Sequence, residues 1–199
     1  MSDEQPRQDT PRIEIEPNGP FRVTGGVPLR REEIVRSPDG HSLDWRVTEE
    51  FPAEQTYLLC RCGRSENKPF CDDSHLLEPP FDGTETADRT PTAERRRELR
   101  TQQLVVGDDE PLCSSMGFCV SRTGDVWGLL LRGRDPEIRS RIIRMIQHCP
   151  SGRLAYALPP DTEDVEQELE PSISVVGGGP LWVKGRVEVI DADGGPWEA

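Results

Sequence analysis

The chain of 199 residues has no long hydrophobic run and little hydrophobic content overall. Apolar residues make up 33% of the sequence, and no stretch approaches the roughly 18 apolar residues that a membrane-spanning helix needs. The N-terminal residues are polar and lack the apolar centre of a secretory signal peptide. These absences predict a protein with no membrane partner and a cytoplasmic location.

Basic charge is also scarce. The sequence has 24 Lys and Arg against 37 Asp and Glu, a formal charge of −13. Binding to nucleic acid or to an anionic membrane surface rewards clustered basic residues, so neither is expected as a partner. No Ser/His/Asp arrangement or phosphate-binding glycine loop is present, and we therefore expect no enzymatic activity.

The sequence does have many turn-forming residues, 18 Gly and 19 Pro, which predict short elements. Alternating apolar residues over 13–16 and 21–24 predict a hairpin around the turn at 18–20. Asp135 and Pro136 form a good helix start. The apolar residues that follow lie on one helical face, and Cys149-Pro150 ends the helix. Further strands are expected near 27–29, 43–47, 57–59, 104–106 and 126–131, and a short charged helix over 94–99.

The end of the sequence repeats its beginning with an offset of 160 positions. Seven positions correspond, and five of them are identical. A shared Gly-Pro turn flanked by alternating apolar residues favours a true duplication over chance. The corresponding residues are Ile13, Ile15, Gly19, Pro20, Phe21, Val23 and Gly25 in the first copy and Ile173, Val175, Gly179, Pro180, Leu181, Val183 and Gly185 in the second.

Six cysteines fall into two sets of three, and in a cytoplasmic protein we expect them to bind metal rather than form disulfides. The first set is Cys60, Cys62 and Cys71, with His75 close behind. Cys60 and Cys62 point to the same side of an extended chain, so both can bind one iron. Cys71 and His75 are one helical turn apart and can bind a second. Three thiolates and one imidazole suit a 2Fe–2S cluster.

Residues 60–75 resemble the CDGSH-type iron–sulfur family, the mitoNEET-like proteins. The family motif reads Cys-x-Cys, two residues, Ser/Thr, three residues, then Pro-x-Cys-Asp-Gly-Ser/Ala/Thr-His. One position departs from it, because Asp73 stands where the family has Gly. If this residue has a positive φ angle, Asp tolerates it better than most residues. The positions that match are Cys60, Cys62, Ser65, Pro69, Cys71, Asp72, Ser74 and His75.

The resemblance implies a 2Fe–2S cluster bound by Cys60, Cys62, Cys71 and His75, with an accessible histidine whose protonation labilises the cluster. Protonated imidazole cannot bind a metal, so acid is expected to release the cluster. The alternative is a zinc site, because three cysteines and one histidine also suit zinc. Cys-x-Cys is less natural for zinc than Cys-x-x-Cys.

The second set is Cys113, Cys119 and Cys149, the last within Cys-Pro-Ser-Gly. Ferredoxins use Cys-x₂-Cys-x₂-Cys with a distant Cys-Pro, and here Met116 occupies the middle ligand position. Residues 103–157 resemble the divergent single-cluster ferredoxin domain. The resemblance implies a 3Fe–4S cluster on three thiolates, or a 4Fe–4S cluster with water or His148 as fourth ligand. The alternative is that these are buried structural cysteines.

The predicted fold class is mainly β with minor α (α+β): a CDGSH-type β-cap with a cluster-binding loop and a ferredoxin-like α+β middle segment. The strands of the second copy are expected to pair with those of the first. Either the chain is shortened after 172–199, or the second copy survives only as strands. The expected divisions are a disordered tail at 1–11, the CDGSH domain at 12–77, a linker at 78–102, the ferredoxin-like domain at 103–158, an acidic linker at 159–171 and the partial second CDGSH repeat at 172–199.

The predicted function is electron transfer or donation of the cluster, with a redox protein or an apo-protein that accepts the cluster as partner. A redox or acid sensor and a zinc-binding structural module remain as alternatives. With both halves of the cap in one chain the protein is expected to be a monomer that forms an intrachain pseudo-dimer, and the alternative is a homodimer.

Overall fold

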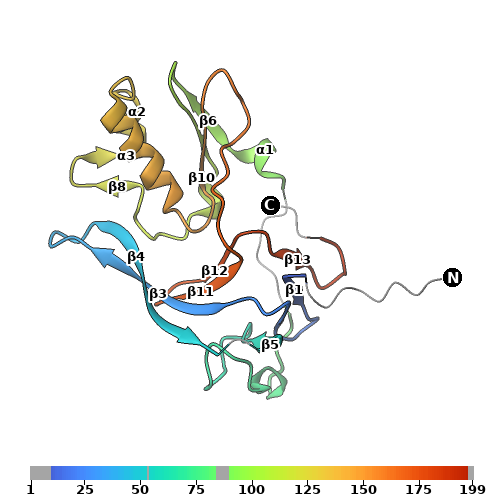
Figure 1. Ribbon diagram of the computed structural model, residues 1–199. Coiled ribbons are helices and arrows are strands. Elements are labelled where there is room, and N and C mark those ends of the chain that lie inside the picture. The colour runs from blue at the N-terminus through green and yellow to red at the C-terminus, as the bar shows by residue number, and fades with distance from the viewer. Residues whose placement is uncertain (1–9, 53, 84–89, 197–199) are drawn as a thin grey trace.

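The computed structural model describes residues 10–52, 54–83 and 90–196, and most of the predicted tail at 1–11 lies outside them. It contains short strands and few helices, so the prediction of a mainly β fold with minor α is confirmed (Figure 1). Two four-stranded sheets form the cap, with the strand orders β13-β1-β2-β5 and β12-β11-β3-β4. The strands of the cap are β1 Arg12–Ile15, β2 Phe21–Thr24, β3 Leu29–Arg36, β4 Ser42–Phe51, β5 Thr56–Leu59, β11 Ser172–Val176, β12 Leu181–Lys184 and β13 Glu188–Ile190.

The two copies of the repeat exchange strands. In β1, Ile13 lies opposite Val189 of β13, and in β11, Ile173 lies opposite Leu29 of β3; both pairs are parallel. The two pairs are equivalent under the repeat offset of 160 residues, since Ile13 corresponds to Ile173 and Leu29 corresponds to Val189. The hairpins obey the same shift, since Ile13 faces Val23 and Ile173 faces Val183. The cap therefore has an internal pseudo-twofold in which each hairpin pairs with the third strand of the other copy. The duplication predicts that the two copies pair, and the structure adds which strands do so.

The core of the cap lies where these pairs meet. It combines residues of both copies, and Ile173 from the second is completely buried. A buried carboxylate also joins the copies: Glu32 in β3 is 3% exposed, accepts a hydrogen bond of 2.9 Å from Ser174 Oγ and forms an ion pair with Lys184. The buried residues of this core are Ile13, Val23, Val27, Leu29, Tyr57, Leu59 and Ile173.

The middle segment packs as a separate small unit of sheet and helix. Its sheet has the order β10-β7-β6, and α3 covers a core formed with α2 and the sheet. Its elements are α1 Thr92–Arg95, β6 Arg97–Arg100, β7 Val105–Asp108, β8 Val120–Ser121, β9 Gly124–Asp125, α2 Val126–Leu130, α3 Pro136–Gln147 and β10 Leu154–Ala157. The 3₁₀ turns of the chain are η1 Ser74–Leu76 and η2 Glu110–Leu112.

The predicted helix after Asp135 is confirmed, and the Asp135 side chain accepts a hydrogen bond from the backbone N–H of Glu137. The strand predicted over 126–131 is wrong, because this segment is helix α2. Asp125 caps it by accepting from Gly128 N, and the buried Val126, Leu129 and Leu130 have helical spacing. The apolar residues 126–131 have no clear period, so their pattern favours neither a strand nor a helix. The N-cap Asp125 favours the helix.

The helix predicted over 94–99 is correct only at its beginning. Residues 97–100 form strand β6, which pairs antiparallel with β7. A paired strand of the middle sheet therefore lies in the segment that was predicted as a linker. Among the described residues, no helix is both long and apolar enough to cross a membrane.

The long hairpin of β3 and β4 reaches from the cap to the middle segment (Figure 1). Ser42 donates a hydrogen bond of 2.7 Å from Oγ to the carbonyl of Met116, and Trp45 donates one of 3.1 Å from Nε1 to the carbonyl of His148. The Trp45 ring also lies 4.9 Å from Phe118 and 5.1 Å from Trp182, between ring centroids. This hairpin fixes the second cysteine set against the cap.

The exchange depends on a close approach at Gly185, whose φ is +68° and whose added Cβ would lie 2.5 Å from the carbonyl oxygen of Leu169. Gly178 has the same φ of +68° but no atom within 4 Å of such a Cβ. We expect Gly178→Ala to lower the free energy of unfolding by about 1 kcal/mol through backbone strain alone. Gly185→Ala should lower it by about 2–4 kcal/mol, because a backbone clash is added.

Urea denaturation of the two variants and the parent chain, followed by circular dichroism, measures this difference. Equal losses for the two variants would show that the turn at Gly185 does not need the close approach.

Candidate iron–sulfur sites

The first cysteine set lies directly after β5, the edge strand of one sheet of the cap. Strand β5 pairs with β2 and ends at the buried Leu59. The chain then returns antiparallel to itself: Cys60 N donates to the carbonyl of Pro69, and Cys71 N donates to the carbonyl of Leu58, both at 2.9 Å. Backbone pairing thus brings Cys71 back beside Cys60.

The four predicted ligands form two close pairs. The sulfur atoms of Cys60 and Cys62 lie 3.9 Å apart, and the Cys71 sulfur lies 3.5 Å from Nδ1 of His75. Two such ligands at about 2.0–2.3 Å from one tetrahedral metal ion are separated by roughly 3.4–3.8 Å. The donor atoms therefore fit one metal ion per pair, which is the arrangement a binuclear cluster needs.

The non-ligand residues of the motif shape the loop. Ser65 donates from Oγ to the Phe70 carbonyl at 2.7 Å and accepts from Asn67 N at 3.0 Å. Asp72 accepts from Glu66 N at 2.8 Å and from the Ser74 hydroxyl at 2.6 Å. The hydrogen bond from Ser74 is the main reason that the pKa of Asp72 lies well below its usual range. Asp72 is thus an ionised anchor that holds the turn between Cys71 and His75.

Asp73, the residue that departs from the family motif, has a φ of +64°. The positive φ angle considered for this position from the sequence is therefore present. Gly is the usual residue in this left-handed conformation, and Asp is tolerated there. The Asp73 carboxylate lies 4.0 Å from the Cys71 sulfur. It adds a negative charge beside the cysteines without replacing a ligand.

The thiols of this loop influence one another. Burial is the largest cause that raises the pKa of Cys71, and the charges of Asp73, Cys60 and Cys62 add to it. Burial also opposes ionisation of Cys62, but hydrogen bonds from the Arg64 backbone N–H and from Cys60 outweigh it and lower the pKa of the Cys62 thiol. Thiolates crowded in this way are stabilised by a bound cation.

The second cysteine set lies around a small cavity of the middle segment. Cys113 follows η2, Cys149 follows α3, and both line the cavity with Cys119 and Arg153. Among the described residues, the three ligand atoms that all lie within 4.8 Å of one another belong to Cys71, Asp73 and His75. The sulfur atoms of Cys113, Cys119 and Cys149 therefore do not all lie within 4.8 Å of one another, so they are not arranged as three ligands of one ion.

His148 is not placed to act as the fourth ligand considered from the sequence. Its Nδ1 lies 2.7 Å from the carbonyl of Arg144, its Nε2 lies 3.2 Å from Asp44, and its ring stacks on Phe118 at 5.4 Å. Both ring nitrogens are therefore engaged away from the cysteine cavity, which His148 does not line.

Sequence reasoning missed Arg153, the one charged residue among those that line the cysteine cavity. Its Nε donates 2.7 Å to the buried Asp108, which also accepts from Trp127 Nε1 at 3.0 Å. This carboxylate is the main cause of the raised pKa of Arg153, so the guanidinium stays charged. A hydrogen bond from Ser115 N, followed by one from Arg153, lowers the pKa of Cys113. Nothing in the spacing of the cysteines signals this residue.

Comparisons with known proteins agree with the geometry. Residues 18–76 match the family described as iron-binding zinc finger CDGSH type, and residues 99–159 match the divergent 4Fe-4S mono-cluster family. A segment of 29 residues is 55% identical to the mouse (Mus musculus) CDGSH iron-sulfur domain-containing protein 3, mitochondrial; it covers 15% of this chain and 21% of that protein. The chain thus spans about a fifth of the length of this relative. No solved structure matches.

The cysteine pairs of the loop and these matches support binding of an iron–sulfur cluster. Two separate segments of the chain, residues 18–76 and 99–159, are thus similar to two different iron–sulfur families.

Proposed function

We propose that the loop holds a 2Fe–2S cluster, with Cys60 and Cys62 on one iron and Cys71 and His75 on the other. The observation that carries the proposal is the pair of separations, 3.9 Å between sulfurs and 3.5 Å between sulfur and Nδ1. When bound, the cluster supplies one-electron redox chemistry. The residues of the chain orient the four ligand atoms and fix the turn through Ser65 and Asp72.

The protein acts in electron transfer or in cluster transfer, with a redox protein or an apo-protein that accepts the cluster as partner. Support comes from the position of the histidine at an exposed edge. Leu76 and Leu77 follow His75 directly and are 67% and 63% exposed. Exposed apolar side chains beside a ligand provide a contact surface for another protein. A catalytic role is not part of this proposal, and the cytoplasmic location stays a prediction from composition.

Cys113, Cys119 and Cys149 hold a second cluster, a 3Fe–4S or a 4Fe–4S cluster. Support comes from their shared cavity and from the guanidinium of Arg153, which offsets the negative charge of several thiolates. With the exchanged strands inside one chain, the proposed state is a monomer.

Iron, sulfide and zinc analysis of anaerobically purified full chain tests both sites. We expect iron and sulfide, an electron paramagnetic resonance signal of a 2Fe–2S centre after reduction, and a separate signal from the middle segment. A colourless preparation that contains stoichiometric zinc would instead establish the zinc-binding module. Incubation with an apo-ferredoxin then separates cluster transfer, in which the acceptor gains the visible spectrum, from electron transfer alone.

His75→Cys should keep the first cluster, make it more resistant to acid and lower its reduction potential, because a thiolate adds negative charge where neutral imidazole was bound. The measurements are the potential by spectroelectrochemistry and cluster loss at mildly acidic pH. His41→Cys is the matched control, since His41 lies outside the loop beside Asp39. An unaltered potential in His75→Cys would show that His75 is not a ligand.

Asp73→Asn should raise the potential of the first cluster by tens of millivolts with no change in iron content, because it removes a negative charge 4.0 Å from the Cys71 sulfur. Asn also tolerates the φ of +64° at this position. Asp72→Asn, which weakens the anchoring hydrogen bonds, should instead reduce cluster retention. If the two variants behave alike, Asp73 has a structural role rather than an electrostatic one.

Arg153→Gln should lower the potential of the cluster in the middle segment, because the cluster loses a nearby positive charge. Arg97→Gln is the matched control: Arg97 also faces Asp108, at 3.5 Å, but its side chain is 70% exposed and does not line the cysteine cavity. Arg153→Lys should restore most of the shift. Equal potentials in Arg153→Gln and Arg97→Gln would show that Arg153 only supports the fold.

A further inference from the structure

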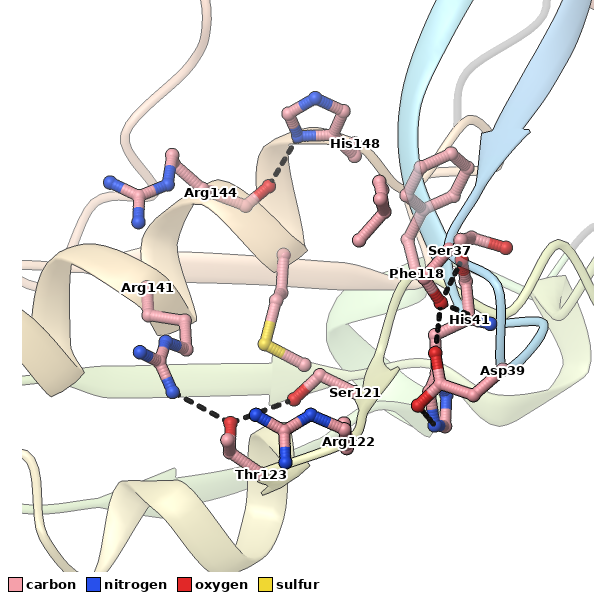
Figure 2. A pocket seen from close by; sticks show the side chains of 13 residues that line it. Ser37, Asp39, His41, Phe118, Ser121, Arg122, Thr123, Arg141, Arg144 and His148 are labelled. Carbon is pink, nitrogen blue, oxygen red and sulfur yellow. Dashed lines mark hydrogen bonds and ion pairs between the residues drawn. The ribbon is translucent and has the colours of Figure 1, made fainter.

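A second cavity, of about 340 Å³, lies between the tip of the β3–β4 hairpin and the middle segment (Figure 2). The hairpin contributes His41 and Leu43 to it, and the middle segment contributes Phe118 and Arg141. Its volume falls within the range of about 300–1,000 Å³ that is typical of small-molecule sites. No cysteine lines it, so it is distinct from both candidate cluster sites.

Positive charge gathers at this cavity although the chain as a whole is strongly acidic. Arg122, Arg141 and Arg144 line it, and within the described part of the chain none of them forms an ion pair. Figure 2 shows the guanidinium groups of Arg122 and Arg141 on either side of Thr123, whereas the Arg144 side chain turns outward. Arg141 donates a hydrogen bond of 2.6 Å to Thr123 Oγ1. Two charged donors and a hydroxyl thus lie close together, and neither arginine forms an ion pair within the described residues.

The carboxylate that does line the cavity, Asp39, is engaged on the hairpin side. It accepts a hydrogen bond from the hydroxyl of Ser37, and Nε2 of His41 lies 3.8 Å from its Oδ2. Arg122 is also near enough to lower the pKa of Asp39, although the hydrogen bond from Ser37 is the larger cause. One carboxylate against the two guanidinium groups of Arg122 and Arg141 leaves the cavity with an excess of positive charge.

Part of the remaining wall is apolar, beside the polar residues Ser42, Ser121 and His148. Phe118 and Met145 are buried, and Leu43 extends from the hairpin beside them. An inorganic anion would satisfy the guanidinium groups but would leave this apolar surface uncovered. A molecule with an apolar ring and a phosphate satisfies both, because guanidinium groups match phosphate geometry and the ring covers the apolar walls.

We propose that this cavity, the arginine pocket, binds a small organic phosphate of mononucleotide size. The phosphate lies between Arg122 and Arg141 and accepts hydrogen bonds from them, and the ring lies against Phe118 and Met145. A polynucleotide does not fit, because the net charge of −13 repels a long polyanion. Phe118 directly precedes Cys119, so a bound molecule lies next to the second cysteine set.

Isothermal titration calorimetry of the full chain with three probes tests the proposal. The probes are AMP, which has ring and phosphate; adenosine, which has the ring alone; and inorganic phosphate. We expect AMP to bind at least tenfold more tightly than either of the others, and added salt to weaken its binding. Equal affinity of AMP and inorganic phosphate would leave only a surface anion site and overturn the proposal.

Arg141→Gln should weaken AMP binding roughly tenfold to a hundredfold, the loss expected for one charged hydrogen bond. Arg134→Gln is the matched control, because Arg134 precedes the same helix, contacts Gln102 and does not line the pocket. Arg122→Gln, at an exposed position, gives a second variant if Arg141→Gln folds poorly. Unchanged AMP binding in a folded Arg122→Gln or Arg141→Gln variant would overturn the proposal. A preparation without any cluster leaves this test intact, since the pocket contains no cysteine.

Discussion

The exchange of strands between the two copies of the repeat is the constraint on which the rest of the molecule depends. Each hairpin is too small to bury its own apolar residues, and an isolated hairpin is marginal in water. Pairing Ile13 with Val189 and Ile173 with Leu29 joins the copies into one core. The internal tie from Glu32 to Ser174 and Lys184 fixes the register, because a shift of one residue would leave a buried carboxylate without its partners. Residues 160 positions apart therefore stabilise each other, and a chain with a modest apolar content obtains a core that neither copy could form alone.

The same cap positions the chemistry at its two ends. Strand β5 lies between β2 and the cluster loop, and its end fixes the position of Cys60. The backbone hydrogen bonds donated by Cys60 and Cys71 close the loop around the ligands. On the other side, the β3–β4 hairpin extends past the cap and uses Trp45 to contact the residues around the second cysteine set. The cysteines of both sets lie in loops, and the neighbouring strands, the 3₁₀ turn η2 and helix α3 anchor the ends of these loops. Ligand pairs held at suitable separations favour metal binding, because the chain then has little to rearrange when the metal binds.

Features that depend on nearby residues, such as helix caps, turns and the ligand motif, could be predicted from the sequence. The pairing of strands far apart in the chain could be predicted only in part. The capping residue Asp135, the turn at Gly19-Pro20 and the four predicted ligands depend on neighbours within sixteen residues, so their patterns are visible in one segment. The duplication indicated that the copies pair, but not that β1 joins β13 while β3 joins β11. The apolar segment after Asp125 was misassigned because six apolar residues without a period fit a strand and a helix equally well. Arg153 and the arginine pocket could not be found, because their residues meet only through packing of elements far apart in the chain.

The charged residues near the two cysteine sets differ: Asp73 and Arg64 lie near the first set, and Arg153 lies near the second. Asp73 lies 4.0 Å from the sulfur of Cys71, whereas Arg153 donates a hydrogen bond toward Cys113 and is held in place by Asp108. A negative charge beside a cluster disfavours the added electron and a positive charge favours it. Asp73 is therefore expected to lower the potential of the proposed first cluster and Arg153 to raise that of the proposed second, while the Arg64 guanidinium opposes the effect of Asp73 at the first site. Arg153 is held in place by its hydrogen bond to Asp108, whereas the net charge of −13 acts on both sites alike. The difference between the two sites therefore comes from the charged residues close to the thiols and not from the overall acidity.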